Sequence, residues 1–101
     1  MKNKYVIIFH PKAEKEYLES VEWYEDALIG LGDEFVNEIE TTINRIQNNP
    51  LLFPVKKLQI REAVVKKFPF VILFQLKEKE NQLFILSVYH TSRNPKKKYR
   101  K

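Results

Sequence analysis

Hydrophobic and polar positions follow a helical period in the first half of the chain and a strand-like pattern in the second. From Pro11 to Leu28 apolar residues recur every three or four positions, which predicts one amphipathic helix. The segment 30–32 (Gly-Leu-Gly) holds the only two glycines and should break this helix. A second helix is then predicted to run to about Asn48, with Asp33 as its N-cap. Such a short connection predicts an antiparallel helical hairpin.

The second half contains short, dense apolar blocks that are typical of buried strands. The block Phe68–Leu76 (FPFVILFQL) is rich in β-branched and aromatic residues, which predicts a strand buried on both faces. Five polar residues (KEKEN) separate it from Gln82–His90, so the two blocks should pair antiparallel in the middle of a sheet. Strands are also predicted over Tyr5–Phe9 and Gln59–Lys67, whereas the proline-containing segment 50–58 is predicted to be a loop.

These elements follow the order β-α-α-β-β-β and predict an α+β fold. We expect an antiparallel sheet of about four strands, packed against the N-terminal helical hairpin, because each helix has one apolar stripe to bury. A length of 101 residues suits one domain spanning 1–101. From about residue 91 onward we expect little regular structure and a basic tail.

Composition removes several classes of function. The chain has no cysteine, which excludes disulfides, thiolate metal sites and cysteine nucleophiles. No apolar run is long enough for a transmembrane helix, and the N-terminal run YVIIF is too short for the core of a secretory signal. We therefore expect a cytoplasmic protein that does not act at a membrane and needs no metal or cofactor.

Charge is distributed unevenly along the chain. The overall net charge is +5, but residues 11–49 carry −7 and residues 50–101 carry +10. Residues 90–101 alone hold six bases and no acid. This asymmetry favours a polyanionic partner for the second half, either nucleic acid or an acidic protein segment. A solvated basic tail that keeps the protein soluble is the alternative.

One group of residues would suit metal-independent cleavage of RNA. Such a reaction needs a base for the ribose 2′-OH, an acid for the leaving oxygen and cations at the phosphate. His90 can exchange a proton at cellular pH, and Arg61 and Arg93 can clamp phosphate through their planar guanidinium groups. Alternatively, His90 bonds to backbone at a strand end and Arg61 forms a surface ion pair.

A second group would contact a target or partner without catalysis. It consists of basic and tyrosine side chains, whereas Lys56 and Lys57 are possible helpers in the cleavage of RNA. Its members are Lys66, Lys67, Tyr89, Lys96, Lys97, Lys98, Tyr99 and Arg100.

Alternation along the last strand predicts how these groups face. His90 should share a face with Leu86 and Val88, whereas Tyr89 should lie on the face of Leu83 and Ile85. We expect folding to gather the cationic second half around His90, with the acidic hairpin packed behind.

Four segments in this order resemble the RelE/ParE superfamily of toxin–antitoxin toxins, and in particular its ParE-like, plasmid-stabilisation branch. The first is the helix end EWYEDALIGLGDEF, and the second is the pattern NNP-x-x-F-P after the isoleucine-spaced second helix. The third is the Arg61 strand leading to FPFVILF, and the fourth is the ending YH-x-x-R-x-P. The resemblance covers nearly the whole chain.

This resemblance implies a small, cytoplasmic, basic toxin that a cognate antitoxin neutralises by wrapping around it. In the superfamily, ParE-like members poison DNA gyrase, whereas RelE-like members cut mRNA on the ribosome without metal. The strand Phe68–Leu76 offers no catalytic group on either face, which favours the ParE-like activity. A RelE-like endoribonuclease and a non-toxic module that binds nucleic acid or an acidic peptide remain alternatives.

Overall fold

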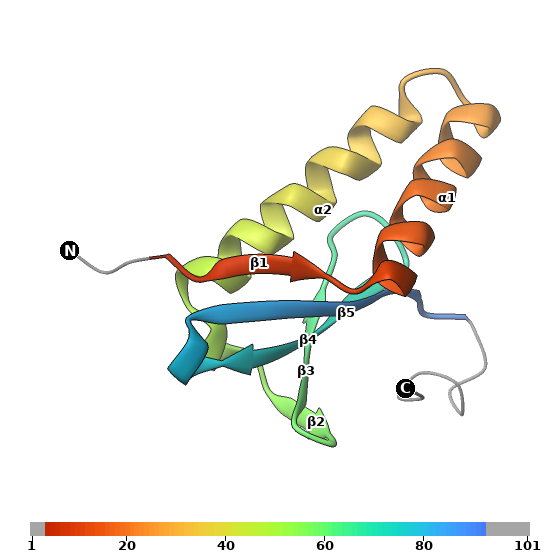
Figure 1. Ribbon diagram of the computed structural model, residues 1–101. Helices are drawn as coiled ribbons and strands as arrows, with labels where there is room; N and C mark the ends of the chain where they lie inside the picture. Colours follow the sequence, from red (N-terminus) through yellow and green to blue (C-terminus); the bar gives the residue numbers. More distant parts are fainter. Residues whose placement is uncertain (1–3, 93–101) are drawn as a thin grey trace.

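The computed structural model describes residues 4–92 and has two layers, a helical hairpin and a five-stranded sheet (Figure 1). In chain order the elements are β1 (Val6–Phe9), α1 (Pro11–Ala27), α2 (Leu31–Asn48), the 3-10 turn η1 (Pro50–Leu52), β2 (Val55–Lys57), β3 (Ile60–Val64), β4 (Phe70–Lys77), the 3-10 turn η2 (Glu78–Glu80) and β5 (Gln82–His90). The order β-α-α-β-β-β of the long elements and the α+β class are confirmed.

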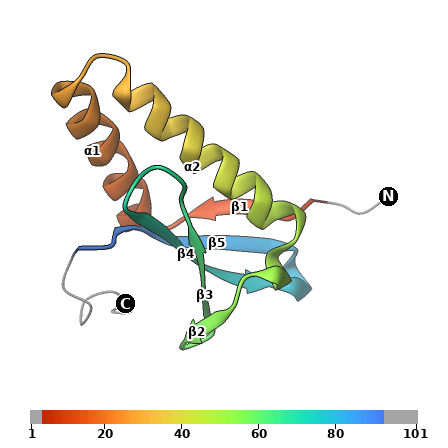
Figure 2. The same cartoon turned by 180° about the vertical axis from the view of Figure 1, so that it is seen from behind.

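The sheet has the strand order β1-β5-β4-β3-β2, so the predicted central pair β4 and β5 lies in its middle. Strands β2 to β5 pair antiparallel, whereas β1 joins β5 in parallel. The sheet has five strands rather than about four, because the short strand β2 forms within the predicted loop 50–58. Val55–Lys57 follows the last proline of that segment, and it pairs only at the sheet edge, where its other side needs no partner. Strands β3 and β2 turn steeply away from β5 (Figure 2).

The turn between the helices shows why Asp33 is not the N-cap. Helix α2 begins at Leu31, and Gly30 occupies the cap position with φ +91°, a left-handed conformation that favours glycine. The carboxylate of Glu25 in α1 accepts hydrogen bonds from the backbone N–H groups of Gly30 and Gly32, each at 3.0 Å. Glu25, which belongs to the preceding helix, therefore takes the role expected of Asp33. At the other end of α1, Nδ1 of His10 accepts from the N–H of Lys12 at 3.1 Å and caps that helix.

The core lies between the hairpin and one face of the sheet. Helix α2 contributes Phe35, Ile39 and Ile46, which are fully buried. The ring of Phe35 lies 5.1 Å from that of Phe68 and 4.9 Å from that of Phe70. These contacts fix the start of β4 against the hairpin, at the sheet end where β5 terminates.

Candidate functional site

The last strand contains a β-bulge that decides which way its end faces. Leu73 of β4 pairs with Ser87, but the next residue, Phe74, pairs with Ile85. Leu86 is therefore an extra residue in β5, and the strict alternation of side chains is interrupted at this point.

Beyond the bulge the two faces of β5 are exchanged. Val88 packs into the helix-facing core together with Ile85, whereas Tyr89 packs with Leu86 on the opposite face. His90 pairs with Phe70 and lies on the helix-facing side. His90 shares a face with Val88 as predicted, but not with Leu86, and Tyr89 does not lie on the face of Leu83 and Ile85, because a single inserted residue reverses the alternation.

A buried carboxylate on α1 holds the bulge in place. Oε1 of Glu16 accepts hydrogen bonds from the hydroxyl of Ser87 at 2.7 Å and from the backbone N–H of Val88 at 3.1 Å. Glu16 is only 7% exposed, although the helix pattern places it among the outward-facing acids. Ser87, a polar residue within an apolar strand, was the one signal in the sequence for this contact.

His90 is held at the end of β5 by local contacts. Its ring lies 5.0 Å from that of Phe70 in an edge-on arrangement. Nδ1 accepts the backbone N–H of Ser92 at 3.2 Å and lies 2.7 Å from the hydroxyl of the same residue. Because a backbone N–H can only donate, Nδ1 carries no proton in this arrangement, and a neutral ring holds its proton on Nε2.

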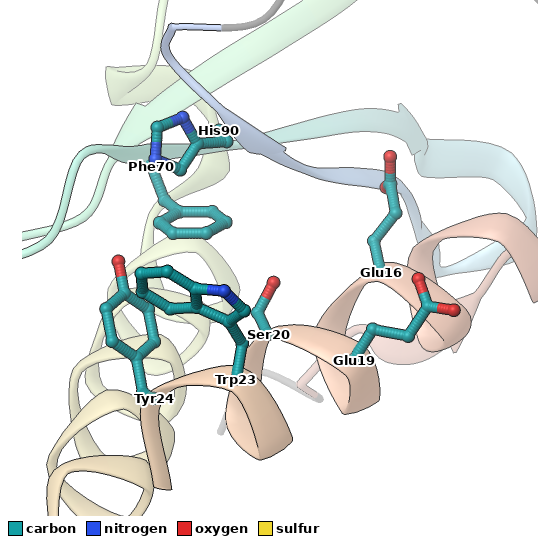
Figure 3. A pocket seen from close by; sticks show the side chains of 7 residues that line it. All are labelled: Glu16, Glu19, Ser20, Trp23, Tyr24, Phe70 and His90. Atoms are coloured by element: carbon teal, nitrogen blue, oxygen red, sulfur yellow. The ribbon is translucent and has the colours of Figure 1, made fainter. Parts of the chain in front are cut away.

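A cavity of about 300 Å³ lies between α1, the first residue of β4 and the last residue of β5 (Figure 3). Trp23 is 67% exposed, and its ring meets that of Tyr24 edge-on at 5.1 Å. Burial raises the pKa of the Tyr24 hydroxyl, which is therefore protonated at neutral pH. We call this cavity the α1 pocket; its lining residues are Glu16, Glu19, Ser20, Trp23, Tyr24, Phe70 and His90.

Two of the predicted binding lysines lie at the same end of the sheet as His90. Lys66 and Lys67 belong to the connection between β3 and β4, and the carbonyl of Pro69 in this connection accepts the N–H of Thr91 at 2.8 Å. Nζ of Lys67 lies 3.6 Å from the carboxylate of Glu38 on α2, and the lysine is largely exposed.

Arg61 lies elsewhere. It pairs with Phe74, which lies four residues along β4 from Phe70, the partner of His90. At about 3.3 Å per residue, this offset places Arg61 roughly 13 Å away from His90 along the strand direction. Nη1 of Arg61 donates to the carbonyl of Phe53 at 2.6 Å, so its guanidinium group holds the segment that leads into β2.

The cationic residues that the structure describes therefore do not all gather around His90. Lys56 and Lys57 lie on the edge strand β2, next to β3 and Arg61, and His90 instead faces the acidic helix α1. The remaining candidates lie outside the described residues 4–92: Arg93, Lys96, Lys97, Lys98, Tyr99 and Arg100.

Within residues 4–92 no group of three or more His, Cys, Asp or Glu side chains is placed to hold a metal ion. No helix in the same range is long and apolar enough to cross a bilayer.

Comparison with known proteins assigns the family. Residues 7–95 match the family model described as the ParE toxin of the type II toxin–antitoxin system parDE. A search of curated protein sequences found no match. Among solved structures, a chain of "Chromosomal ParDE TA system from P. aeruginosa" has a similar fold, with a TM-score of 0.72 and 18% identity over 87% of this chain and 97% of that one. The chain thus belongs to the ParE toxin family of type II toxin–antitoxin systems.

Proposed function

We propose that this chain arrests bacterial growth by inhibiting DNA gyrase and that a cognate antitoxin neutralises it. The observation that carries the proposal is the match of residues 7–95 to the ParE toxin family. This match begins at the second residue of β1 and extends past the end of β5, so it includes both helices and the other four strands in full. ParE-like toxins act by binding gyrase, so a surface for a protein partner is what this function requires.

The geometry supports binding rather than RNA cleavage. A ribonuclease would need its proton-transfer group and its phosphate clamp around one scissile bond, within hydrogen-bonding reach of it. Arg61 and His90 lie roughly 13 Å apart along the strand direction, and Arg61 is engaged by the carbonyl of Phe53. His90 faces the carboxylates of Glu16 and Glu19 across the α1 pocket, surroundings that repel an RNA phosphate.

Expression of the chain alone should test toxicity. We expect growth arrest, and we expect co-expression of the antitoxin encoded by the neighbouring gene to restore growth. Arrested cells should show DNA damage, since a poisoned gyrase leaves broken DNA. Soluble expression at high yield without arrest would contradict the proposal.

A second measurement separates the two toxin mechanisms. Primer extension on mRNA from arrested cells should find no cuts in the ribosomal A site, and His90→Ala should remain toxic. A-site cuts that are lost about 100-fold or more in His90→Ala, the usual scale for removing an acid–base group, would instead establish the RelE-like activity.

A gel-shift titration addresses the non-toxic alternative. A binding module for nucleic acid would bind DNA without sequence preference, and its affinity would fall steeply as salt rises, because each phosphate contact releases counterions. Such binding in a chain that causes no arrest would favour the module over the toxin.

A further inference from the structure

We propose that the α1 pocket receives an arginine side chain of the antitoxin. This inference rests on the proposed function, since it takes the partner to be an antitoxin. It adds the chemistry of one contact: a guanidinium group stacked on Trp23 and bonded to the carboxylate of Glu19.

The charge of the pocket differs from that of the chain. Glu16 and Glu19 bring two carboxylates to its wall, and the protonated hydroxyl of Tyr24 adds a polar group. Within residues 4–92, its lining includes no lysine or arginine. The pocket carboxylates belong to the acidic segment 11–49, which carries −7 on a chain with a net charge of +5, so this site attracts a cation that the basic second half of the chain repels.

The aromatic walls favour a planar cation. Trp23, Tyr24 and Phe70 line one side of the cavity, and the Trp23 indole is seen below the ring of Phe70 (Figure 3). Guanidinium stacks on an indole face and binds a carboxylate through two parallel N–H groups, which an ammonium group does not do. A volume of about 300 Å³ lies at the lower end of the range for ligand pockets and suits one side chain.

The two carboxylates have different tasks. Oε1 of Glu16 is bonded to Ser87 and Val88, so this residue is fixed and contributes charge at the base of the pocket. Glu19 is exposed, lies one turn further along α1 and also lines the pocket, with its carboxylate turned away from the Trp23 indole (Figure 3). Glu19 is therefore the carboxylate available to an incoming guanidinium.

Charge complementarity favours the antitoxin as the source of this arginine. Acidic side chains of a partner find cations at many positions on the second half of this chain, so they add affinity without defining a register. An arginine is repelled by that half and finds its carboxylates on the acidic segment 11–49, where the α1 pocket places one beside aromatic rings. One arginine in the α1 pocket thus fixes the position of the partner segment and rejects segments that lack it.

Trp23 makes the first test direct, because it is the only tryptophan in the chain and its fluorescence reports on the pocket. The probe is N-acetyl-arginine amide, and the control is N-acetyl-citrulline amide, which has the same shape without the charge. We expect a saturable change in Trp23 emission with the arginine probe and at least tenfold weaker binding of the citrulline probe. Equal binding of the two probes would overturn the proposal.

Two matched variants of the full chain complete the test. Glu19→Gln should weaken the arginine probe and the purified antitoxin by about tenfold, an effect of about 1.4 kcal/mol. Glu22→Gln removes the same charge from the same helix outside the pocket and should change neither affinity by more than about twofold. Antitoxin affinities that are equal for Glu19→Gln and Glu22→Gln would overturn the proposal. A loss confined to purified gyrase would overturn the assignment of the occupant.

The outcome is separable from that of the proposed function. If the chain binds the arginine probe through Glu19, and Glu19→Gln weakens the antitoxin, the pocket assignment holds even where gyrase is unaffected. If gyrase is inhibited and the antitoxin relieves the inhibition equally for both variants, the function holds and the pocket assignment fails.

Discussion

The hydroxyl of Ser87 in β5 donates a 2.7 Å hydrogen bond to Oε1 of Glu16 in α1, across 71 residues of chain. This contact holds the β-bulge of β5 against the first helix, and the bulge turns His90 toward α1. The α1 pocket exists in this form because a helix carboxylate and a strand hydroxyl meet at one point of the core.

Removal of Glu16 should therefore destabilise the fold. In Glu16→Ala the hydroxyl of Ser87 and the N–H of Val88 lose an acceptor, and each unsatisfied buried group costs about 1–3 kcal/mol. We expect a decrease of about 2–4 kcal/mol in the free energy of unfolding, measured by urea titration. Ser87→Ala should cost less, about 1 kcal/mol. Glu19→Ala, at an exposed position, should stay within about 0.5 kcal/mol, and an equal effect of Glu16→Ala and Glu19→Ala would refute this role.

The two-residue turn between β2 and β3 should be improvable. Leu58 and Gln59 have φ values of 54° and 65°, as a type I′ turn requires, yet neither residue favours that conformation. Replacement by Asn-Gly, the pair that suits this turn, should stabilise the protein by about 1–2 kcal/mol. The control is the single change Leu58→Ala, which keeps the strain of a positive φ at this position. No gain in the midpoint of urea unfolding would show that the turn is unstrained.

Both glycines of the interhelical turn should be required, for different reasons. At Gly32 an added Cβ would lie 2.9 Å from Oε1 of Glu25 and 3.0 Å from the carbonyl of Val21. At Gly30 the space is open, but φ is +91°. We expect Gly32→Ala to cost about 1–3 kcal/mol through overpacking and Gly30→Ala about 1–2 kcal/mol through backbone strain.

Thermal unfolding can check this difference. Glu25→Ala removes the carboxylate that Gly32→Ala would displace, so the two changes together should cost less than the sum of their separate effects. Gly30→Ala leaves the space around Glu25 open. Additive effects of Glu25→Ala and Gly32→Ala would contradict the proposed clash.

Stability should decline at alkaline pH. Burial, with a smaller contribution from Glu40, raises the pKa of Tyr17 above its ordinary value of 10.0. Below pH 10 the Tyr17 hydroxyl is protonated in both the folded and the unfolded chain. Above pH 10 the unfolded chain loses this proton first, because its pKa is the lower of the two. Rising pH therefore favours unfolding until the pKa of the folded chain is passed. Tyr17→Phe should flatten the decline in urea-unfolding free energy above pH 10. An unchanged slope in Tyr17→Phe would show that this hydroxyl does not contribute.

The fold was largely predictable from the sequence because its signals are local. The bounds of β5 agree with the apolar block Gln82–His90, and the hairpin follows from two apolar stripes around the segment 30–32. The cap of α2 was missed, since Glu25 supplies it from another helix. Strand β2 was missed as well, because its pairing with β3 overrides a proline-rich local pattern.

The candidate site was less predictable, because it depends on tertiary contacts. Simple alternation pairs His90 correctly with Val88 but wrongly with Leu86, since no local rule indicates that Leu86 is an extra residue. Trp23 lies off the main apolar stripe of α1, and only the fold brings it to the same pocket as Phe70. Arg61 and His90 were grouped by chemistry, whereas the strand register separates them.

The most direct test of the central claim is a DNA supercoiling assay with purified gyrase, this chain and its antitoxin. The account predicts that the chain alone inhibits supercoiling or traps cleaved DNA, and that an equimolar amount of antitoxin restores gyrase activity. Unchanged gyrase activity with a saturating excess of the chain, together with mRNA cut in the ribosomal A site of arrested cells, would contradict it.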